Sequence, residues 1–102
     1  MITHITTTQQ FEEEVKNFEG KVLVDFFADW CAPCRMLGPI VEDIANETDS
    51  VKVCKLNIDE LPEIAREYKV MSIPTLIVFN KGSEEKKSVG VISKSEIKEL
   101  IS

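Results

Sequence analysis

Two near-continuous apolar runs, "KVLVDFFA" (21–28) and "VKVCKLNI" (51–58), constrain the fold of this chain more than any other feature. Each has the length of a strand without the alternation of a half-exposed one, so both strands are predicted to be covered on both faces. Between them, five apolar residues share one face of a predicted helix: Leu37, Ile40, Val41, Ile44 and Ala45. Strand, helix and strand in this order predict a right-handed parallel crossover in an α/β fold.

Shorter patterns on either side of this crossover extend the prediction. A short N-terminal strand is expected to lead into a helix that begins at a Thr7-x-x-Gln10 capping box and ends at Gly20. Asp59 and Pro62 are start signals for a short helix after the second apolar run.

The last third of the chain predicts an antiparallel hairpin and a final helix. The hairpin strands are expected at 75–79 and 88–92, joined by the polar loop "NKGSEEKK". A Ser93-x-x-Glu96 capping box then begins the helix. The prediction is one domain over residues 1–102, with about five strands in a mixed sheet and four helices.

Composition limits the partners and the compartment. A chain of 102 residues with 43% hydrophobic content is long enough for one core of its own. The net charge of -6 disfavours a nucleic-acid or anionic-membrane surface, which needs clustered Lys and Arg. No apolar run approaches the roughly 18 residues of a spanning helix, and "MITHITTTQQ" lacks a secretory pattern. We therefore expect a cytoplasmic protein, a monomer by default, whose partners are proteins or small molecules.

The segment "WCAPC" places Cys31 and Cys34 at the turn between the first apolar run and the long helix. In open α/β sheets this carboxyl edge is where ligands bind. With Cys31 as the N-cap, helix N–H groups and the helix dipole favour its thiolate and lower the pKa of Cys31. Cys31 is therefore predicted to be the nucleophile, and Cys34, one turn inward, the more covered resolving thiol. Pro33 suits a first helical turn, where its missing N–H has no intrahelical partner.

The cysteine pair could serve as a structural staple, a metal site or a redox couple. A bridge that closes a four-residue loop stabilises by about 2 kcal/mol, against about 3 for fifteen residues, so a purely structural staple gains little. A closed zinc or iron-sulfur site needs more ligands, and the chain offers only the isolated Cys54 and His4. A pair that is reversibly oxidised and reduced is the favoured hypothesis, with a metal site and an inert pair as the alternatives.

Asp25 is an anomaly inside the first apolar run. Burial makes a charge costly and pushes the pKa of a carboxyl upward, so this group can exchange a proton near neutral pH. We predict that Asp25 accepts the proton of Cys34 when that thiol attacks a mixed disulfide. The alternative is a carboxylate paired with Lys55 on the neighbouring strand, without a catalytic role.

Several motifs together resemble the thioredoxin family over essentially the entire chain: "VDFFAD" before "WCAPC", Pro39 in the helix, "KLNID", "SIPTLIVF" and the glycine of "VGV". The resemblance implies a thioredoxin fold, with a central mixed five-stranded sheet flanked by four helices. It also implies a general protein-disulfide reductant, an oxidoreductase that carries electrons on the Cys31-Cys34 disulfide and needs no other cofactor. The implied partners are a thioredoxin reductase and disulfide-containing target proteins.

Position by position, the resemblance makes Cys31 the attacking cysteine, Cys34 the resolving one, and Asp25 and Lys55 the members of a buried ion pair. It further implies a cis-proline at position 74 and pairing of the Ile73 backbone with an extended target segment. The implied docking surface around the Cys31 sulfur consists of Trp30, Ala32, Pro33, Ile73, Pro74 and Gly90. Core packing is the other interpretation of Trp30.

The chain departs from the family pattern at two positions. Ala32 stands where glycine is usual between the cysteines, and Phe27 stands where tryptophan is common. No histidine lies between the cysteines, and the disulfide-isomerase branch of this fold uses a cation there to favour its reduced form. The absence of such a cation argues for a reductant. A disulfide oxidant or isomerase on the same fold, and a redox-independent docking module, remain as alternatives.

Overall fold

A five-stranded mixed sheet organises the computed structural model, which describes residues 1–102. The strand order is β1-β3-β2-β4-β5. The first three strands run parallel to one another, and β4 and β5 are antiparallel to their neighbours. The strands are β1 (Ile2–Ile5), β2 (Lys21–Phe27), β3 (Lys52–Asn57), β4 (Thr75–Asn80) and β5 (Ser83–Val89). This confirms the predicted mixed five-stranded sheet.

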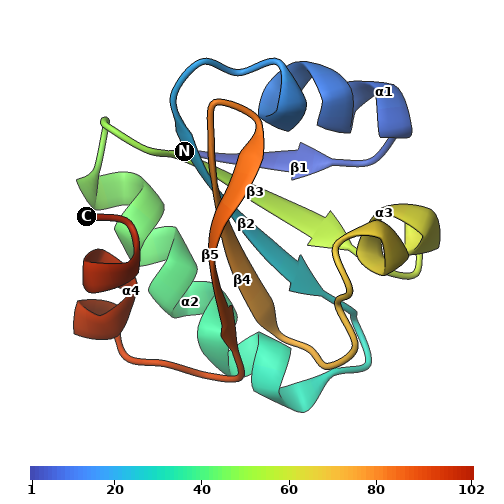
Figure 1. Cartoon of the computed structure of the whole chain (residues 1–102). Coiled ribbons are helices and arrows are strands. Elements are labelled where there is room, and N and C mark those ends of the chain that lie inside the picture. Colours follow the sequence, from blue (N-terminus) through green and yellow to red (C-terminus); the bar gives the residue numbers. More distant parts are fainter.

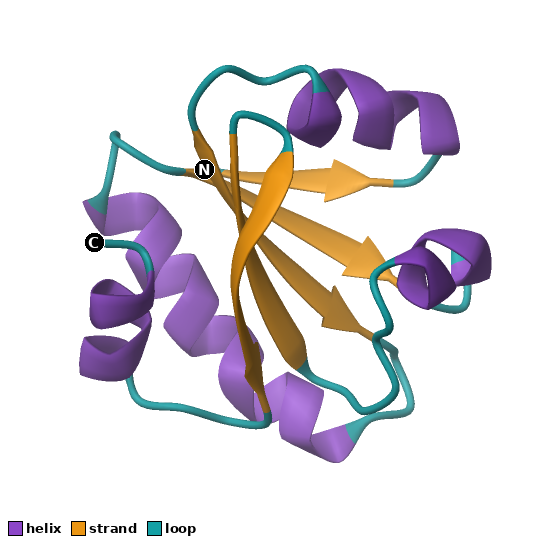
Figure 2. Ribbon diagram, viewed as in Figure 1, coloured by secondary structure: helices purple, strands orange, loops and turns teal.

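Helices cover both faces of this sheet (Figure 1). α1 and α3 lie on one face, and α2 and α4 lie on the other, as the ribbon in Figure 2 shows by type of structure. The helical elements are α1 (Thr8–Phe11), which continues as the π-helical segment η1 (Glu12–Lys16), α2 (Ala32–Glu47), α3 (Pro62–Glu67) and α4 (Lys94–Leu100). None of them is long and apolar enough to cross a membrane.

The sheet separates two apolar cores. Phe11 of α1 and Ile64 of α3 pack with Phe26 on one face, while Leu37 of α2 and Ile97 of α4 pack on the other. The inner residues of β2 are all buried because helices cover both of its faces. The apolar runs therefore predicted the crossover from β2 through α2 to β3 correctly, and it brings the carboxyl ends of two parallel strands together at one edge.

The predicted hairpin is present, but its predicted loop was wrong. The turn consists of Lys81 and Gly82 alone, with φ values of 53° and 83°, and β5 begins at Ser83. Positive φ at both central residues belongs to the two-residue turns that suit the twist of a hairpin. The polar residues assigned to the loop form β5 instead, because this strand is at the edge of the sheet with mostly exposed side chains.

The first helix also differs from its prediction. The Thr7 hydroxyl accepts the Gln10 backbone N–H at 3.0 Å, but the Gln10 side chain accepts the N–H of Thr6 at 2.8 Å, so the capping box is only half formed. The helix ends at Lys16, well before Gly20, since η1 closes with a bond from the Asn17 N–H to the Glu12 carbonyl at 2.8 Å.

The predicted start of α4 is confirmed, and the predicted start of α3 is partly wrong. The full capping box of Ser93 and Glu96 is present at the start of α4, as predicted. α3 begins at Pro62, but its N-cap is Leu61 and no side chain caps it. Asp59 is therefore wrong as a start signal, because its carboxylate accepts a hydrogen bond from Trp30 instead of capping α3.

Candidate active site

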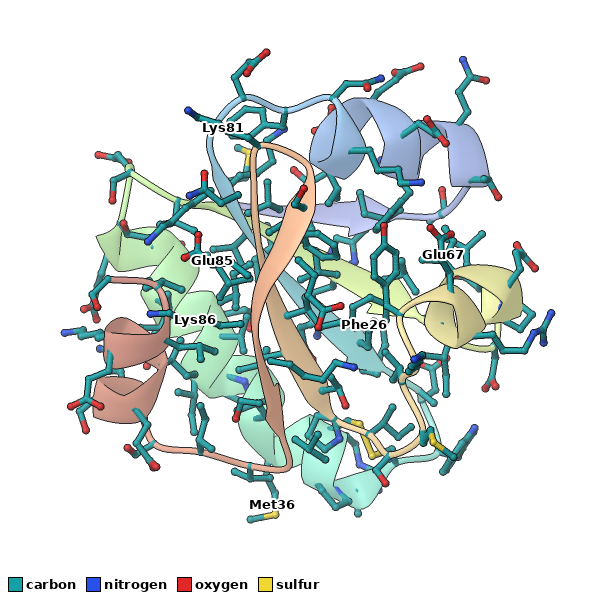
Figure 3. All side chains as sticks on the ribbon, viewed as in Figure 1. Phe26, Met36, Glu67, Lys81, Glu85 and Lys86 are labelled. Carbon is teal, nitrogen blue, oxygen red and sulfur yellow. A yellow bond between two sulfur atoms is a disulfide. The ribbon has the colours of Figure 1, made fainter.

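The two cysteines of "WCAPC" lie where β2 has ended and α2 begins, and they form a disulfide with a Cα–Cα distance of 5.3 Å (the yellow bond in Figure 3). Cys31 has an extended backbone and is the N-cap of α2. Its sulfur accepts the N–H of Cys34, the third helical residue, at 3.3 Å. This is the predicted capping geometry, and it aims the positive end of the helix dipole and a backbone donor at the Cys31 sulfur.

The two cysteines differ less in burial than predicted. Cys31 is 4% exposed and Cys34 is 5% exposed, so the expectation that Cys34 is the more covered one is wrong for this oxidised form. The reason is that Ile58 and Ile73 pack against the cysteine pair, and the carbonyl oxygen of Ile73 lies 3.7 Å from the Cys31 sulfur. A target that reaches Cys31 must displace or replace some of this cover.

Asp25 is buried in β2 with only 1% exposure, and its Oδ1 has no hydrogen-bond partner. Burial raises the pKa of Asp25 from its ordinary value of 3.8 to about 6, against a smaller opposing effect of the positive charge on Lys55. The predicted burial and direction of the pKa shift are confirmed. A carboxyl with such a pKa changes its protonation state close to neutral pH, as a proton acceptor requires.

Lys55 is the register neighbour of Asp25 on β3, but the two do not form the implied buried ion pair. The Lys55 ammonium instead lies 4.6 Å from the centre of the Phe27 ring. Gly38 of α2 faces the ammonium, but a Cβ there would lie 3.7 Å from Lys55 Nζ, an ordinary van der Waals contact, so the position of Lys55 does not depend on this glycine. The ion-pair interpretation of Asp25 is therefore wrong in its geometry, although the Lys55 charge still acts on the carboxyl through space.

A pocket of about 320 Å³ lies beside Cys34, and Lys55, Gly38 and Phe27 contribute to its walls. The exposed side chains of His4, Arg35 and Glu42 also line it, so it extends from Cys34 to the surface. No group of three or more His, Cys, Asp or Glu side chains is placed to hold a metal ion. The third cysteine, Cys54, lies inside β3, where burial raises the pKa of its thiol to about 12.

The segment that covers Cys31 from the side of β4 has the implied backbone geometry. The peptide bond between Ile73 and Pro74 is cis, and the Pro74 carbonyl accepts the N–H of Gly90 at 2.8 Å. Gly90 has a φ of 94°, and a Cβ on this residue would meet only open space, so its backbone conformation rather than crowding favours glycine.

Trp30 is on the surface rather than in the core. Its side chain is 67% exposed, which excludes the core-packing interpretation, and its indole N–H donates to Asp59 Oδ2 at 2.9 Å. Ala32 and Pro33 are exposed beside it. Sequence reasoning missed two residues here, Asp59 and Ile58. Both lie in or beside the motif "KLNID", but nothing in that motif indicates that their side chains turn toward the active site.

A mixed sheet with a disulfide at the N-terminus of a helix, and a buried carboxyl in the strand before that helix, defines the class of dithiol–disulfide oxidoreductases. A model of the thioredoxin family, described as "Thioredoxin", matches residues 2–102. The chain is 49% identical to a thioredoxin of Rickettsia bellii over 93% of its own length and 91% of that protein, and 43% identical to one of Pseudomonas aeruginosa over 95% and 93%.

Solved structures give the same result. The fold is similar to that of a mutant thioredoxin from Halobacterium salinarum, with a TM-score of 0.90 and 35% identity over 98% of this chain and 87% of that one. A thioredoxin of Malassezia sympodialis matches with a TM-score of 0.91 and 32% identity over 99% and 88%. The chain belongs to the thioredoxin family. It is a protein-disulfide oxidoreductase that acts as a disulfide reductant through Cys31 and Cys34.

Proposed function

We propose that Cys31 is the attacking thiolate and Cys34 the resolving thiol. The observation that carries this assignment is the position of Cys31 as N-cap of α2, with its sulfur accepting the Cys34 N–H at 3.3 Å. In the reduced protein the same donor and the helix dipole favour negative charge on Cys31 and not on Cys34.

The exchange has two steps. The Cys31 thiolate attacks one sulfur of the target disulfide, the target S–S bond breaks, and the leaving target sulfur takes up a proton. Cys34 then transfers its proton to the Asp25 carboxylate and attacks the Cys31 sulfur, which breaks the mixed disulfide. The second target sulfur leaves as a thiolate and takes up a proton from water. The target gains two electrons, and the protein is left with the Cys31–Cys34 disulfide.

Target docking is assigned to the residues around Cys31: Trp30, Ala32, Pro33, Ile73, Pro74 and Gly90, of which Pro74 is buried and acts through the cis bond before it. Trp30 offers a large exposed ring, and the Ile73 backbone before the cis bond is next to the sulfur. An extended target segment can pair with that backbone as an added strand.

The remaining assignments concern partners and setting. A thioredoxin reductase returns the disulfide to the dithiol, and disulfide-containing proteins are the targets. A monomer that needs no cofactor beyond its own disulfide completes this part of the proposal. A reductant acts where thiols are kept reduced, and this supports the cytoplasm as its location.

The test is a pair of serine variants. Cys34→Ser is expected to accumulate a mixed disulfide with a target, because the first bond forms and the second step is blocked. Cys31→Ser is expected to be inactive and to trap nothing. Mass spectrometry of both variants after incubation with a peptide disulfide decides between them, and equal trapping by both would contradict the assigned roles.

A further inference from the structure

Three consecutive residues at the end of β3 contact the active site from outside the "WCAPC" turn. Ile58 packs against the cysteine pair, and Asp59 accepts the indole N–H of Trp30. Asn57, which precedes them, has no role in the exchange described above. We propose that Asn57 is a positioning residue, which holds Asp59 and thereby fixes Trp30 for target docking. The inference rests on the docking role proposed for Trp30.

The side chain of Asn57 connects both acidic residues near the indole. Its Oδ1 accepts the backbone N–H of Asp59 at 2.9 Å, and its Nδ2 lies 3.5 Å from Asp29 Oδ2. The first contact sets the direction in which Asp59 leaves the strand. The second is longer and weaker, but it directs the amide toward the residue that precedes Trp30.

The backbone of Asn57 closes the same loop. Its carbonyl accepts the N–H groups of Glu60 at 3.1 Å and Leu61 at 3.2 Å, so the chain from β3 to the start of α3 turns around this one residue. The side chain and backbone together leave the Asp59 carboxylate little freedom to turn away from the indole.

Asp29 is restrained from its other side. Its carbonyl accepts a bond from Arg35 Nη1 of α2 at 2.8 Å, which ties the turn after β2 to the helix. The Asp29 carboxylate faces Asn57, and the indole N–H of Trp30 donates to Asp59. With the Asn57 amide facing Asp29, Asp59 is the acceptor, and the ring takes one orientation.

Restraint of Trp30 matters because packing does not provide it. The side chain is 67% exposed, so the hydrogen bond to Asp59 is its main fixed contact. A side chain that is ordered before binding loses less entropy when a target docks on it. Releasing it is expected to weaken target docking by roughly threefold to tenfold and to leave the chemical steps unchanged.

The first measurement is the fluorescence anisotropy decay of the full chain, in which Trp30 is the one tryptophan. Asn57→Ala removes both contacts and is expected to add a fast local rotation, as is Asp59→Ala. Asn57→Asp keeps an oxygen for the Asp59 N–H but loses the donor toward Asp29, so its fast component should be intermediate. Asn80→Ala is the matched control, because Asn80 bonds Glu85 at the opposite end of the sheet and should leave the decay unchanged.

The second measurement is the rate at which each reduced variant reduces a synthetic peptide disulfide, as a function of peptide concentration. For Asn57→Ala we expect a KM raised threefold to tenfold with a limiting rate within about twofold of the unaltered chain. Trp30→Ala tests the docking role separately: an unchanged KM in that variant would refute docking on Trp30 while leaving the anisotropy result intact.

Three outcomes would overturn the proposal. An Asn57→Ala decay identical to that of the unaltered chain would show that Asn57 does not restrain Trp30. A fast component with an unchanged KM would show that the restraint has no part in docking. A fall in the limiting rate accompanied by lost thermal stability, without recovery in Asn57→Asp, would assign Asn57 a structural role instead.

Discussion

Asp25 is a buried group whose ionisation lowers the stability of the folded protein near neutral pH. Because its pKa is raised from 3.8 to about 6 in the folded protein, the native state holds its proton over a pH range in which the unfolded chain has lost it. Stability from this group is therefore greatest below about pH 4 and decreases as pH rises to about 6. A shift of about two pKa units corresponds to about 3 kcal/mol.

We therefore predict that Asp25→Ala stabilises the protein at pH 7 by about 1–3 kcal/mol, less than the full amount because the smaller side chain leaves space. The advantage should shrink as pH falls and become small near pH 4, where the carboxyl is protonated in the folded protein and partly protonated in the unfolded chain. Urea denaturation at pH 4, 5, 6 and 7 measures this. A difference that is independent of pH would mean that ionisation of Asp25 is not its cause.

The same variant tests the proton transfer. Without the carboxylate, attack by Cys34 on the mixed disulfide is expected to slow by about 10²-fold near neutral pH. This factor is the lower end of the usual rate enhancement by a positioned acid or base. The measurement is release of the target thiol in stopped flow between pH 6 and 9. Equal rates for the variant and the unaltered chain over that range would remove Asp25 from the mechanism.

Single residues differ in how far they could be predicted. A carboxylate inside an apolar run is conspicuous, so the burial of Asp25 and its raised pKa followed from the sequence. Asp59 carries no such mark: it looks like a helix start signal, and its bond to Trp30 joins positions 29 apart in the chain. The Asp25–Lys55 ion pair was wrong because neighbouring positions in register do not require contact between the charged atoms, and the Lys55 ammonium lies over the Phe27 ring instead.

At the scale of elements, the hairpin between β4 and β5 depends on its two-residue turn. Gly82 combines a φ of 83° with a tight approach to η1: a Cβ on this residue would lie within 2.2 Å of the Lys16 carbonyl oxygen. Gly90 has a similar φ of 94°, but no heavy atom lies within 4 Å of such a Cβ. A comparison of substitutions at these two glycines therefore separates the cost of backbone strain from the cost of a clash.

Gly82→Ala is accordingly expected to lower the free energy of unfolding by about 3 kcal/mol, from strain and clash together. Gly90→Ala should cost only about 1–2 kcal/mol, from strain alone. Both are measured by urea denaturation at one pH. Equal losses in the two variants would mean that η1 moves aside without a significant cost.

Elements that are buried on two faces were predicted well, and those at the margins were not. β2 and β3 had to be apolar throughout because helices cover both faces of the sheet at its centre. β5 has mostly exposed side chains, so its sequence resembles that of a loop. Only its antiparallel pairing with β4 identifies it as a strand. η1 was not predicted, because the sequence shows no pattern specific to a π-helix. Its hydrogen bonds join residues five positions apart, one more than in an α-helix.

For the whole molecule, the reduction potential is the property that separates a reductant from an oxidant. The two residues between the cysteines, Ala32 and Pro33, are exposed and uncharged, so they supply no cation to stabilise the dithiol form. We expect a potential at or below roughly -220 to -260 mV. Equilibration in thiol–disulfide buffers, followed through Trp30 fluorescence, gives the value, and a result near or above about -180 mV would indicate an oxidant or isomerase.

The edges of the sheet have a consequence for which chains this protein can join. Its two outer strands are β1, which has only four residues, and β5, which carries Glu84, Glu85, Lys86 and Lys87 in a row. Short and densely charged edges resist pairing with other polypeptides and so protect against aggregation. A molecule that reduces disulfides in other proteins is thus protected, along both edges of its sheet, from lasting association with the chains that it meets.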